Sequence, residues 1–401
     1  MSHSPNKRFI GLDVHKRSIM VVGLDGQQAV VLPPRRVSLV EFEGWARKVL
    51  QPSDEVILEA TSNAWYVHDL LEPLVERIAV VNPRDVKLIA ASLVKTDKRD
   101  AQILARLLVV NLVPEVWVPP VVVRQLRGLI THRRQLVKQR TAARNRLQGV
   151  LQRQHLVPPE TGLFAQASRS WWQNQDLSPT EQVRIRHDLA LLDHLQPQLA
   201  EVEAELARLS TAAPWLQQTA FLIQLPGIGL LSAMTLLAAI GDVRRFPTAK
   251  KLVGYSGLGS RIYATGDTRR TGAITKQGRR ELRTVLIEAA WSAVQHDPYW
   301  QAQFERLLTR TTKTKAIAAI ARKLLVVVWN VLTAQAADRQ AQPEAVARSL
   351  LRWADTHRLA TRLNLSRAEF VRRELERLGL AHTLTQFEVN GRRIRLEPDP
   401  N

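Results

Sequence analysis

The chain has 401 residues, of which 57 are Lys or Arg and 37 are Asp or Glu, so its formal net charge at pH 7 is +20. A positive excess of this size favours polyphosphate partners, above all nucleic acid, although a ribosome-associated or merely soluble basic protein would share it. Cysteine is absent, which excludes disulfides, thiolate zinc sites and cysteine nucleophiles. The polar N-terminus lacks the apolar stretch of a signal peptide and charges interrupt the apolar runs, so we expect a cytoplasmic protein with no membrane partner.

The first hundred residues predict a mixed sheet. Strands are recognised by short β-prone runs and helices by apolar residues at helical spacing. In chain order these patterns predict strands at 9–14, 18–24 and 28–32, a helix at 37–50, a strand at 55–59, a helix at 65–75 and a strand at 78–81. An antiparallel meander followed by strands separated by helices is the element order of an RNase H-like α/β domain.

Four carboxylates occupy strand ends and a helix start in this region. Asp13 lies in an apolar strand-like run and Glu59 ends the fourth strand, which in this topology pairs beside the first. Asp97 and Asp100 lie three residues apart, on one face of a helix that Thr96 would cap. Four such acids can hold two divalent cations such as magnesium. The alternative is that they are ordinary strand-end charges and first-turn acids, which leaves the cost of an unpaired charge at Asp13 unexplained.

From residue 124 the pattern becomes helical and basic. Residues 124–153 contain no acid, and their cations include Arg133, Arg134 and Lys138, which we expect to contact nucleic acid. A solvated helix face or the exterior of a coiled coil would show the same pattern. A second helical pattern covers residues 181–209, so the two helices predict an antiparallel coiled-coil arm. Arms of this kind commonly form oligomers.

A second informative block begins near residue 221. Leu225-Pro226-Gly227-Ile228-Gly229 between two apolar segments is similar to the hairpin of a helix-hairpin-helix motif, in which Gly227 and Gly229 would let the backbone approach a phosphate. A plain interhelical turn is the alternative. Hydroxyls, glycines and cations are densely mixed over residues 254–278, a composition that suits a flexible loop gripping a sugar-phosphate backbone.

These blocks together resemble a known family, the DEDD transposases of bacterial insertion sequences, whose relatives include Piv-type DNA invertases. The resemblance covers residues 7–293. Its motifs are Gly-Leu-Asp-Val-His-Lys from Gly11, Leu-Glu-Ala-Thr from Leu58, Lys-Thr-Asp-Lys-Arg-Asp-Ala from Lys95, Leu-Pro-Gly-Ile-Gly from Leu225, and the Gly-Leu, Thr-Gly, Arg-Arg and Ile-Thr-Lys-Gln-Gly series within 257–278.

The resemblance implies a fold, an activity and partners. It implies a RuvC-like domain coupled to a C-terminal transposase domain, in a bacterial, nucleoid-associated recombinase that acts on donor and target DNA. Asp13, Glu59, Asp97 and Asp100 would act with Mg²⁺, two ions per site, and with a serine that attacks DNA. A structured guide RNA encoded by the element would pair with both DNAs. The chains would form a homo-oligomer, from dimer to tetramer, whose composite active sites join the acids of one subunit to the serine region of another.

This sequence departs from the family at the serine. The family's serine precedes a glycine, and here Thr265 stands before Gly266. Threonine has the required hydroxyl, but its β-methyl restricts rotation and crowds an in-line attack. Thr265 is therefore the expected nucleophile, Ser260 or another hydroxyl is an alternative, and a divergent copy with weakened chemistry is a third. The phosphate contacts expected around the nucleophile are Arg261, Arg269, Arg270 and Lys276.

We therefore expect four regions. They are a RuvC-like catalytic domain at 1–120, a basic coiled-coil arm at 121–212, a helix-hairpin-helix transposase domain with a nucleophile loop at 213–335, and an extension at 336–401. The extension, with a terminal strand at 386–396, is either an accessory nucleic-acid-binding module or a packed addition. The expected function is strand cleavage and exchange through a covalent hydroxyl–DNA intermediate. The alternatives are a RuvC-like nuclease and a catalytically weakened nucleic-acid-binding relative.

Overall fold

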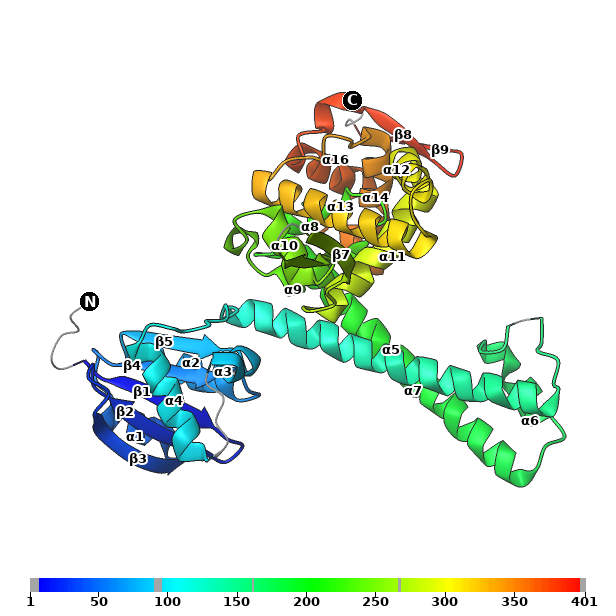
Figure 1. Cartoon of the computed structure of the whole chain (residues 1–401). Helices are drawn as coiled ribbons and strands as arrows, with labels where there is room; N and C mark the ends of the chain where they lie inside the picture. The colour runs from blue at the N-terminus through cyan, green and yellow to red at the C-terminus, as the bar shows by residue number, and fades with distance from the viewer. Residues whose placement is uncertain (1–6, 90–95, 161, 266–267, 397–401) are drawn as a thin grey trace. The chain divides into compact units, whose positions relative to one another are not determined.

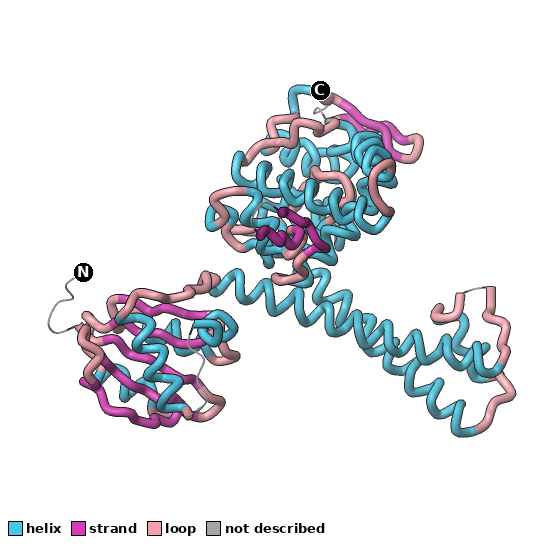
Figure 2. The backbone as a smooth tube through the Cα atoms, viewed as in Figure 1, coloured by secondary structure: helices cyan, strands magenta, loops and turns pink. Residues whose placement is uncertain are grey.

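The structure is a computed structural model that describes residues 7–89, 96–160, 162–265 and 268–396. The chain divides into two compact units, Met1–Pro120 and Val121–Asn401. The first is mixed α/β and the second is mostly helical (Figure 2). The predicted order of the two regions, a mixed sheet followed by a mainly helical part, is thereby confirmed.

The N-terminal unit is built on a five-stranded sheet of order β3-β2-β1-β4-β5 (Figure 1). β1, β2 and β3 pair antiparallel, whereas β4 and β5 continue the sheet parallel to β1. The elements are β1 (Phe9–Val14), β2 (Ser18–Leu24), β3 (Val30–Ser38), α1 (Phe42–Val49), β4 (Glu55–Glu59), α2 (Ala64–Leu71), β5 (Arg77–Val81), α3 (Pro83–Ile89) and α4 (Asp97–Val109).

β3 differs from its predicted bounds, because it extends to Ser38 and delays the following helix to Phe42. Pro33 and Pro34 lie inside this strand. Proline has no N–H to donate to a neighbouring strand, so a strand that contains it is tolerated at the edge of a sheet. β3 is at that edge, which explains why a proline-containing segment still pairs.

The alternating residues of β1 enter two cores on opposite faces of the sheet. Ile10, Leu12 and Val14 pack with the apolar residues of α1 and α2. Phe9 packs with those of α4 on the other face. Gly11 faces α4 as well, and a Cβ built on it would lie 1.9 Å from the carbonyl oxygen of Ala101. Only glycine therefore lets the backbone of α4 lie this close to the central strand.

We expect Gly11→Ala to destabilise the N-terminal unit, because the added methyl group would push α4 off β1. Overpacking of this kind costs about 1–3 kcal/mol of unfolding free energy. Gly44→Ala is the matched control in α1: a Cβ there meets no atom within 4 Å, and alanine favours a helix by about 0.5–1 kcal/mol over glycine. Urea unfolding of the full chain measures both. Equal stability of the two variants would contradict the close approach of α4.

The C-terminal unit begins with two long helices that pack against each other, α5 (Val121–Gln154) and α7 (Pro179–Ser210) (Figure 1). Two ion pairs give their relative direction: Arg133 pairs with Glu203, whereas Arg146, later in α5, pairs with Asp188, earlier in α7. The helices are therefore antiparallel, as the arm hypothesis predicts. Near the far end, Trp172 of the short α6 (Arg169–Gln173) is fully buried in the same core.

The rest of this unit is a helical body with two β-hairpins. Its elements are α8 (Leu216–Ile223), α9 (Leu230–Ile240), α10 (Ala249–Ser256), β6 (Ser260–Thr265), β7 (Thr268–Ile274), α11 (Arg280–His296), α12 (Pro298–Leu308), α13 (Lys313–Ala334), α14 (Pro343–Asp355), α15 (Leu359–Arg362), α16 (Arg367–Arg377), β8 (Gln386–Val389) and β9 (Arg392–Arg395). The region predicted as one terminal strand is thus the β8–β9 hairpin, turned at Asn390-Gly391.

α13 is by length and composition apolar enough to cross a membrane, whereas the charges that interrupt the apolar runs had led us to expect no such helix. Half of its apolar window is buried inside the protein. It packs against α8, α10, α11 and α12, as a core helix does. The C-terminal extension packs onto the same body: Trp353 of α14 is buried and its Nε1 donates to Ser210 Oγ at 2.9 Å.

Candidate active site

Asp13 and Glu59 lie at the carboxyl ends of two adjacent parallel strands. The β1–β4 register pairs Leu12 with Leu58, so the next residues of the two strands are neighbours. Leu12 and Leu58 both enter the core on the α1–α2 side. Because side chains alternate along a strand, Asp13 and Glu59 belong to the opposite face, which α4 covers.

α4 brings two more acids to this end of the sheet. Thr96 caps the helix, as predicted: its Oγ1 accepts a hydrogen bond from the Arg99 backbone N–H at 3.3 Å. Asp97 and Asp100 follow in the first turn, and Ala101 in the same turn is fully buried against the sheet. Asp97 and Asp13 are joined by a residue that the sequence reasoning missed, His15.

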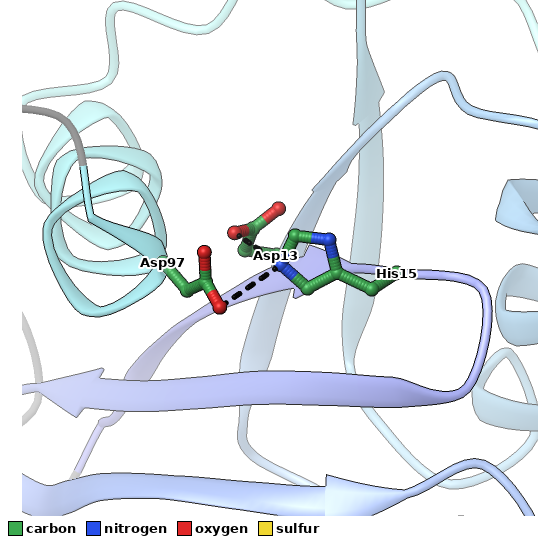
Figure 3. Close-up of side chains that lie close together, drawn as sticks. All are labelled: Asp13, His15 and Asp97. Atoms are coloured by element: carbon green, nitrogen blue, oxygen red, sulfur yellow. Dashed lines mark ion pairs between the residues drawn. The ribbon is translucent and has the colours of Figure 1, made fainter.

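His15 lies between the two carboxylates (Figure 3). Its Nε2 is 3.1 Å from Asp13 Oδ2 and 3.3 Å from Asp97 Oδ2. The ligand atoms of these three residues all lie within 4.8 Å of one another, close enough to bind one metal ion. Asp97 also pairs with Arg36 of β3, whose Nη2 lies 2.5 Å from Oδ2. The sequence could have pointed to His15, because it lies two residues after Asp13 in the same segment. Arg36 is 61 residues from Asp97, and no local pattern in the sequence links the two.

The environment of Asp13 opposes its ionisation. Burial raises the pKa of the Asp13 carboxyl above its usual value, His15 opposes the shift, and the nearby carboxylates of Asp97 and Asp100 raise the pKa further. These contributions identify Asp13, Asp97 and Asp100 as one electrostatic cluster. Mutually repelling carboxylates at the edge of a core are an arrangement that a bound cation stabilises.

Thr265 lies at the free end of the β6–β7 hairpin, in the other unit. The region predicted as a flexible loop is a two-stranded ribbon in which Thr265 pairs with Thr268 and Ser260, at its base, pairs with Ile274. Thr265 is exposed. Gly266 and the side chain of Arg269 fall outside the described residues, so no position is given for them.

The other expected phosphate contacts differ in their surroundings. Arg261 and Arg270 are exposed on the β6–β7 hairpin and Lys276 is exposed just beyond it. On the arm, Lys138 is exposed, whereas Arg133 is held by Glu203, with Nη2 2.6 Å from Oε1. Arg134 lies 3.8 Å from Glu281.

The predicted hairpin at residues 225–229 is a tight turn between α8 and α9. Gly227 has a φ of +79°, and a Cβ there would lie 2.1 Å from the carbonyl oxygen of Ala289, so glycine is required for the turn to pack on α11. Gly229 precedes α9, and a Cβ on it would meet no atom within 4 Å. Of these two glycines, Gly229 is therefore the one with free space around its Cα.

A half-buried polar cluster that the sequence did not reveal joins the arm to the base of the β6–β7 hairpin. Arg127 of α5 donates from Nε to the carbonyl of Ala238 at 2.7 Å, at the end of α9. Arg279, which follows β7, donates from Nε to the Tyr255 hydroxyl at 2.9 Å. Burial and the nearby Arg279 lower the pKa of Arg127 to about 10. The cluster fixes α5, α9, α10 and the segment that leaves β7 relative to one another.

Comparisons with known proteins match both regions. A family model described as "Transposase" matches residues 10–156, and one described as "Transposase IS116/IS110/IS902 family" matches residues 219–305. A Sinorhizobium fredii protein named "Putative transposase y4qE" is 28% identical over 85% of this chain and 86% of its own length. The transposase for insertion sequence element IS1111A of Coxiella burnetii is 24% identical over 82% of this chain and 90% of its own length. The pilin gene-inverting protein of Moraxella bovis is 26% identical over 82% of this chain and 96% of its own length. The matched regions contain the acid cluster and the β6–β7 hairpin.

Proposed function

The chain belongs to the IS116/IS110/IS902 transposase family, and from this premise we propose that it is a magnesium-dependent DNA transposase that cleaves and exchanges strands through a covalent link to a threonine hydroxyl. The observation that carries the proposal is the acid cluster, in which Asp13 and Asp97 converge from a strand end and a helix start. Metal-dependent phosphodiester transfer uses such a cluster, because cations held by the carboxylates would neutralise negative charge on the phosphate.

We infer that the N-terminal unit has the RNase H-like, RuvC-like fold. The sheet order β3-β2-β1-β4-β5, with an antiparallel meander followed by two parallel strands, supports this. The tight turn at Gly227 between α8 and α9 likewise supports a helix-hairpin-helix element. We propose the regions 1–120, 121–212, 213–335 and 336–401 as the functional divisions of the chain, the last being a packed extension.

The acids fit magnesium. Hard divalent cations prefer carboxylate oxygens, and the oxygens of Asp13 and Asp97 lie within one small cluster, with Asp100 acting on Asp13 and Glu59 beside it on β4. Bound Mg²⁺, two ions in our proposal, would stabilise negative charge on phosphate oxygens. His15 contacts both carboxylates and Arg36 contacts Asp97, which holds the cluster together.

Thr265 is the proposed nucleophile. Its hydroxyl oxygen would attack the phosphorus of a DNA phosphodiester while losing its proton, and the bond from phosphorus to the leaving sugar oxygen would break as that oxygen takes up a proton. The strand would then be joined to the threonine as a phosphodiester, ready to exchange with a second strand. The exposure of Thr265 at the end of the ribbon supports access to a duplex, with Arg261, Arg270 and Lys276 close along the same segment and Arg269 between them in sequence.

The proposed partners are donor and target DNA, a structured guide RNA encoded by the element, and further copies of this chain. The net charge of +20 and the arm, with Lys138 exposed on it, support nucleic-acid binding. Purified protein incubated with magnesium, matched DNA and the RNA transcribed from the DNA flanking the coding region tests the proposal. The expected product is a protein–DNA adduct that survives denaturation in detergent. Strand cleavage without any adduct would support the RuvC-like nuclease instead.

We expect two inactive variants to restore each other if the active site is composite. When Asp13→Asn and Thr265→Ala chains are co-expressed, a site that combines the acids of one subunit with the hairpin of another has both intact halves in part of the mixed oligomers. Partial recovery of adduct formation is therefore expected, and the adduct should sit on the chain that keeps Thr265. A mass tag on one chain identifies it. If the mixture stays as inactive as each variant alone, both halves of a site come from one chain.

A further inference from the structure

A pocket of about 690 Å³ lies at the base of the β6–β7 hairpin. Its volume is within the range of about 300–1,000 Å³ that is common for small-ligand sites. α10, the first residues of β6, the segment after β7 and α13 line it. It is therefore distinct from the acid cluster, which belongs to the N-terminal unit, and from the ribbon's free end, where Thr265 lies.

Part of the pocket lining is apolar. Val253 of α10, Ile262 of β6 and Val326 of α13 form this part, and Ile262 is 54% exposed. Two glycines, Gly254 and Gly259, belong to the same lining, and a Cβ on either would meet no atom within 4 Å. The lining therefore has free space beside its apolar side chains.

The same lining also contains three cations. They are Lys250, Arg322 and Lys323, and none of the described lining residues is Asp or Glu. Lys323 donates to the neutral amide oxygen of Gln303 at 2.7 Å, and burial together with Arg306 lowers its pKa. Arg322 has no ion pair within the described ranges. Among the residues that the structure describes, no carboxylate forms an ion pair with these cations, so an anionic ligand would be favoured here.

We propose that this pocket holds one unpaired nucleotide of the strand that the hairpin handles, with the base against Val253, Ile262 and Val326 and its phosphate on Lys250 and Arg322. A nucleotide combines a flat base with an anion, so it can contact both the apolar and the cationic residues of this lining. Ser260, Thr275 and Gln277 supply hydroxyl and amide groups for base edges. The inference rests on the proposed function, because it assumes that the chain handles unpaired strands. DNA and RNA would both supply this chemistry.

The test is equilibrium binding of the full chain, in EDTA, to fluorescein-labelled hairpin oligonucleotides that carry one extrahelical nucleotide. A matched probe has an abasic residue at that position, which keeps the phosphate and removes the base. We expect the base to strengthen binding about fivefold to tenfold. Deoxyribose and ribose versions of both probes are compared. The version in which the base has the larger effect on affinity shows whether the bound strand is DNA or RNA. Equal binding of base and abasic probes in both versions would overturn the proposal.

Two sets of variants locate the effect. Gly254→Met fills the pocket and should abolish the preference for the base, whereas Gly254→Ala, which adds one methyl group to the same helix, should keep it. Lys250→Ala with Arg322→Ala should weaken both probes about tenfold and lower the salt dependence of binding by about one unit of slope. Lys251→Ala with Lys315→Ala removes two exposed cations from the same two helices, outside the pocket, and should have a much smaller effect.

Three results would refute the pocket. The first is an unchanged preference for the base in Gly254→Met, and the second is a lost preference in Gly254→Ala. The third is an equal loss of affinity in the Lys250→Ala, Arg322→Ala variant and in the control variant, which would indicate an effect of general charge alone. Circular dichroism and the unfolding temperature confirm that each variant is folded. Because no metal is present and no strand is cut, a negative result leaves the roles proposed for Asp13 and Thr265 untouched. Loss of adduct formation with normal base preference would conversely leave the pocket intact.

Discussion

Asp13→Asn is expected to abolish protein–DNA adduct formation, by at least about 10³-fold, while leaving the protein folded. The substitution keeps the size of the side chain and one acceptor oxygen, but it replaces the other oxygen with an NH₂ donor and removes the charge at the centre of the acid cluster. Loss of a group that helps to hold catalytic metal removes several kcal/mol of transition-state stabilisation, and each 1.36 kcal/mol is about a factor of ten in rate. Single-turnover assays over a series of magnesium concentrations measure the loss.

The stability of the Asp13→Asn variant is an independent check. Because the folded protein raises the pKa of Asp13, the ionised carboxylate is less favourable in the folded chain than in the unfolded one. This penalty is present above the folded-state pKa and disappears as the pH falls below the unfolded-state value. In EDTA at neutral pH, the asparagine variant should therefore unfold at an equal or higher temperature than the wild type, and the difference should shrink in acid.

Glu43→Gln is the control for the acid cluster. Glu43 is an exposed acid of α1, on the other side of the same sheet, and pairs with Arg47. It should retain adduct formation and its magnesium dependence. Full activity of Asp13→Asn, or an equal loss in Glu43→Gln, would contradict a metal-binding role for the cluster.

Thr265→Ala is expected to eliminate the covalent adduct, again by at least about 10³-fold, because alanine has no hydroxyl to attack the phosphodiester. Thr265→Ser should keep adduct formation or increase it. Serine retains the hydroxyl and removes the β-methyl, which restricts rotation about χ1 and crowds an in-line approach. Electrophoresis under denaturing conditions separates the adduct from free DNA, and mass spectrometry of the digested adduct identifies the attached residue.

Two variants decide between Thr265 and the other hydroxyls of the ribbon. Thr268→Ala removes the hydroxyl of the residue that pairs with Thr265 and is also exposed, so it tests for any effect of altering this end of the ribbon. It should still form the adduct, as should Ser260→Ala. An adduct that persists in Thr265→Ala and disappears in Ser260→Ala would identify Ser260 as the nucleophile. DNA cleavage that needs Asp13 and no hydroxyl of the ribbon would favour the nuclease alternative.

The order of elements was largely available from local sequence patterns. Period-two and helical spacings identified the strands and helices of residues 9–81, and the acids Asp13, Glu59, Asp97 and Asp100 could be selected because each lies at a recognisable strand end or helix start. The arm was likewise visible as two long apolar patterns. Local patterns failed at β3, where the prolines obscured an edge strand, and at residues 260–274, where glycines and hydroxyls predicted a loop and the chain forms a ribbon.

By itself the sequence determined the mixed sheet followed by helices, the choice of four acids and the resemblance to a transposase family, because these depend on neighbouring residues along the chain. Only the tertiary structure decided which distant residues meet. It brought His15 between Asp13 and Asp97, packed α4 on Gly11 and assembled the cationic pocket from α10, β6 and α13. Such contacts depend on the packing of separate elements, and packing distances of a few ångströms are set by side-chain shape on both sides, which no local periodicity records.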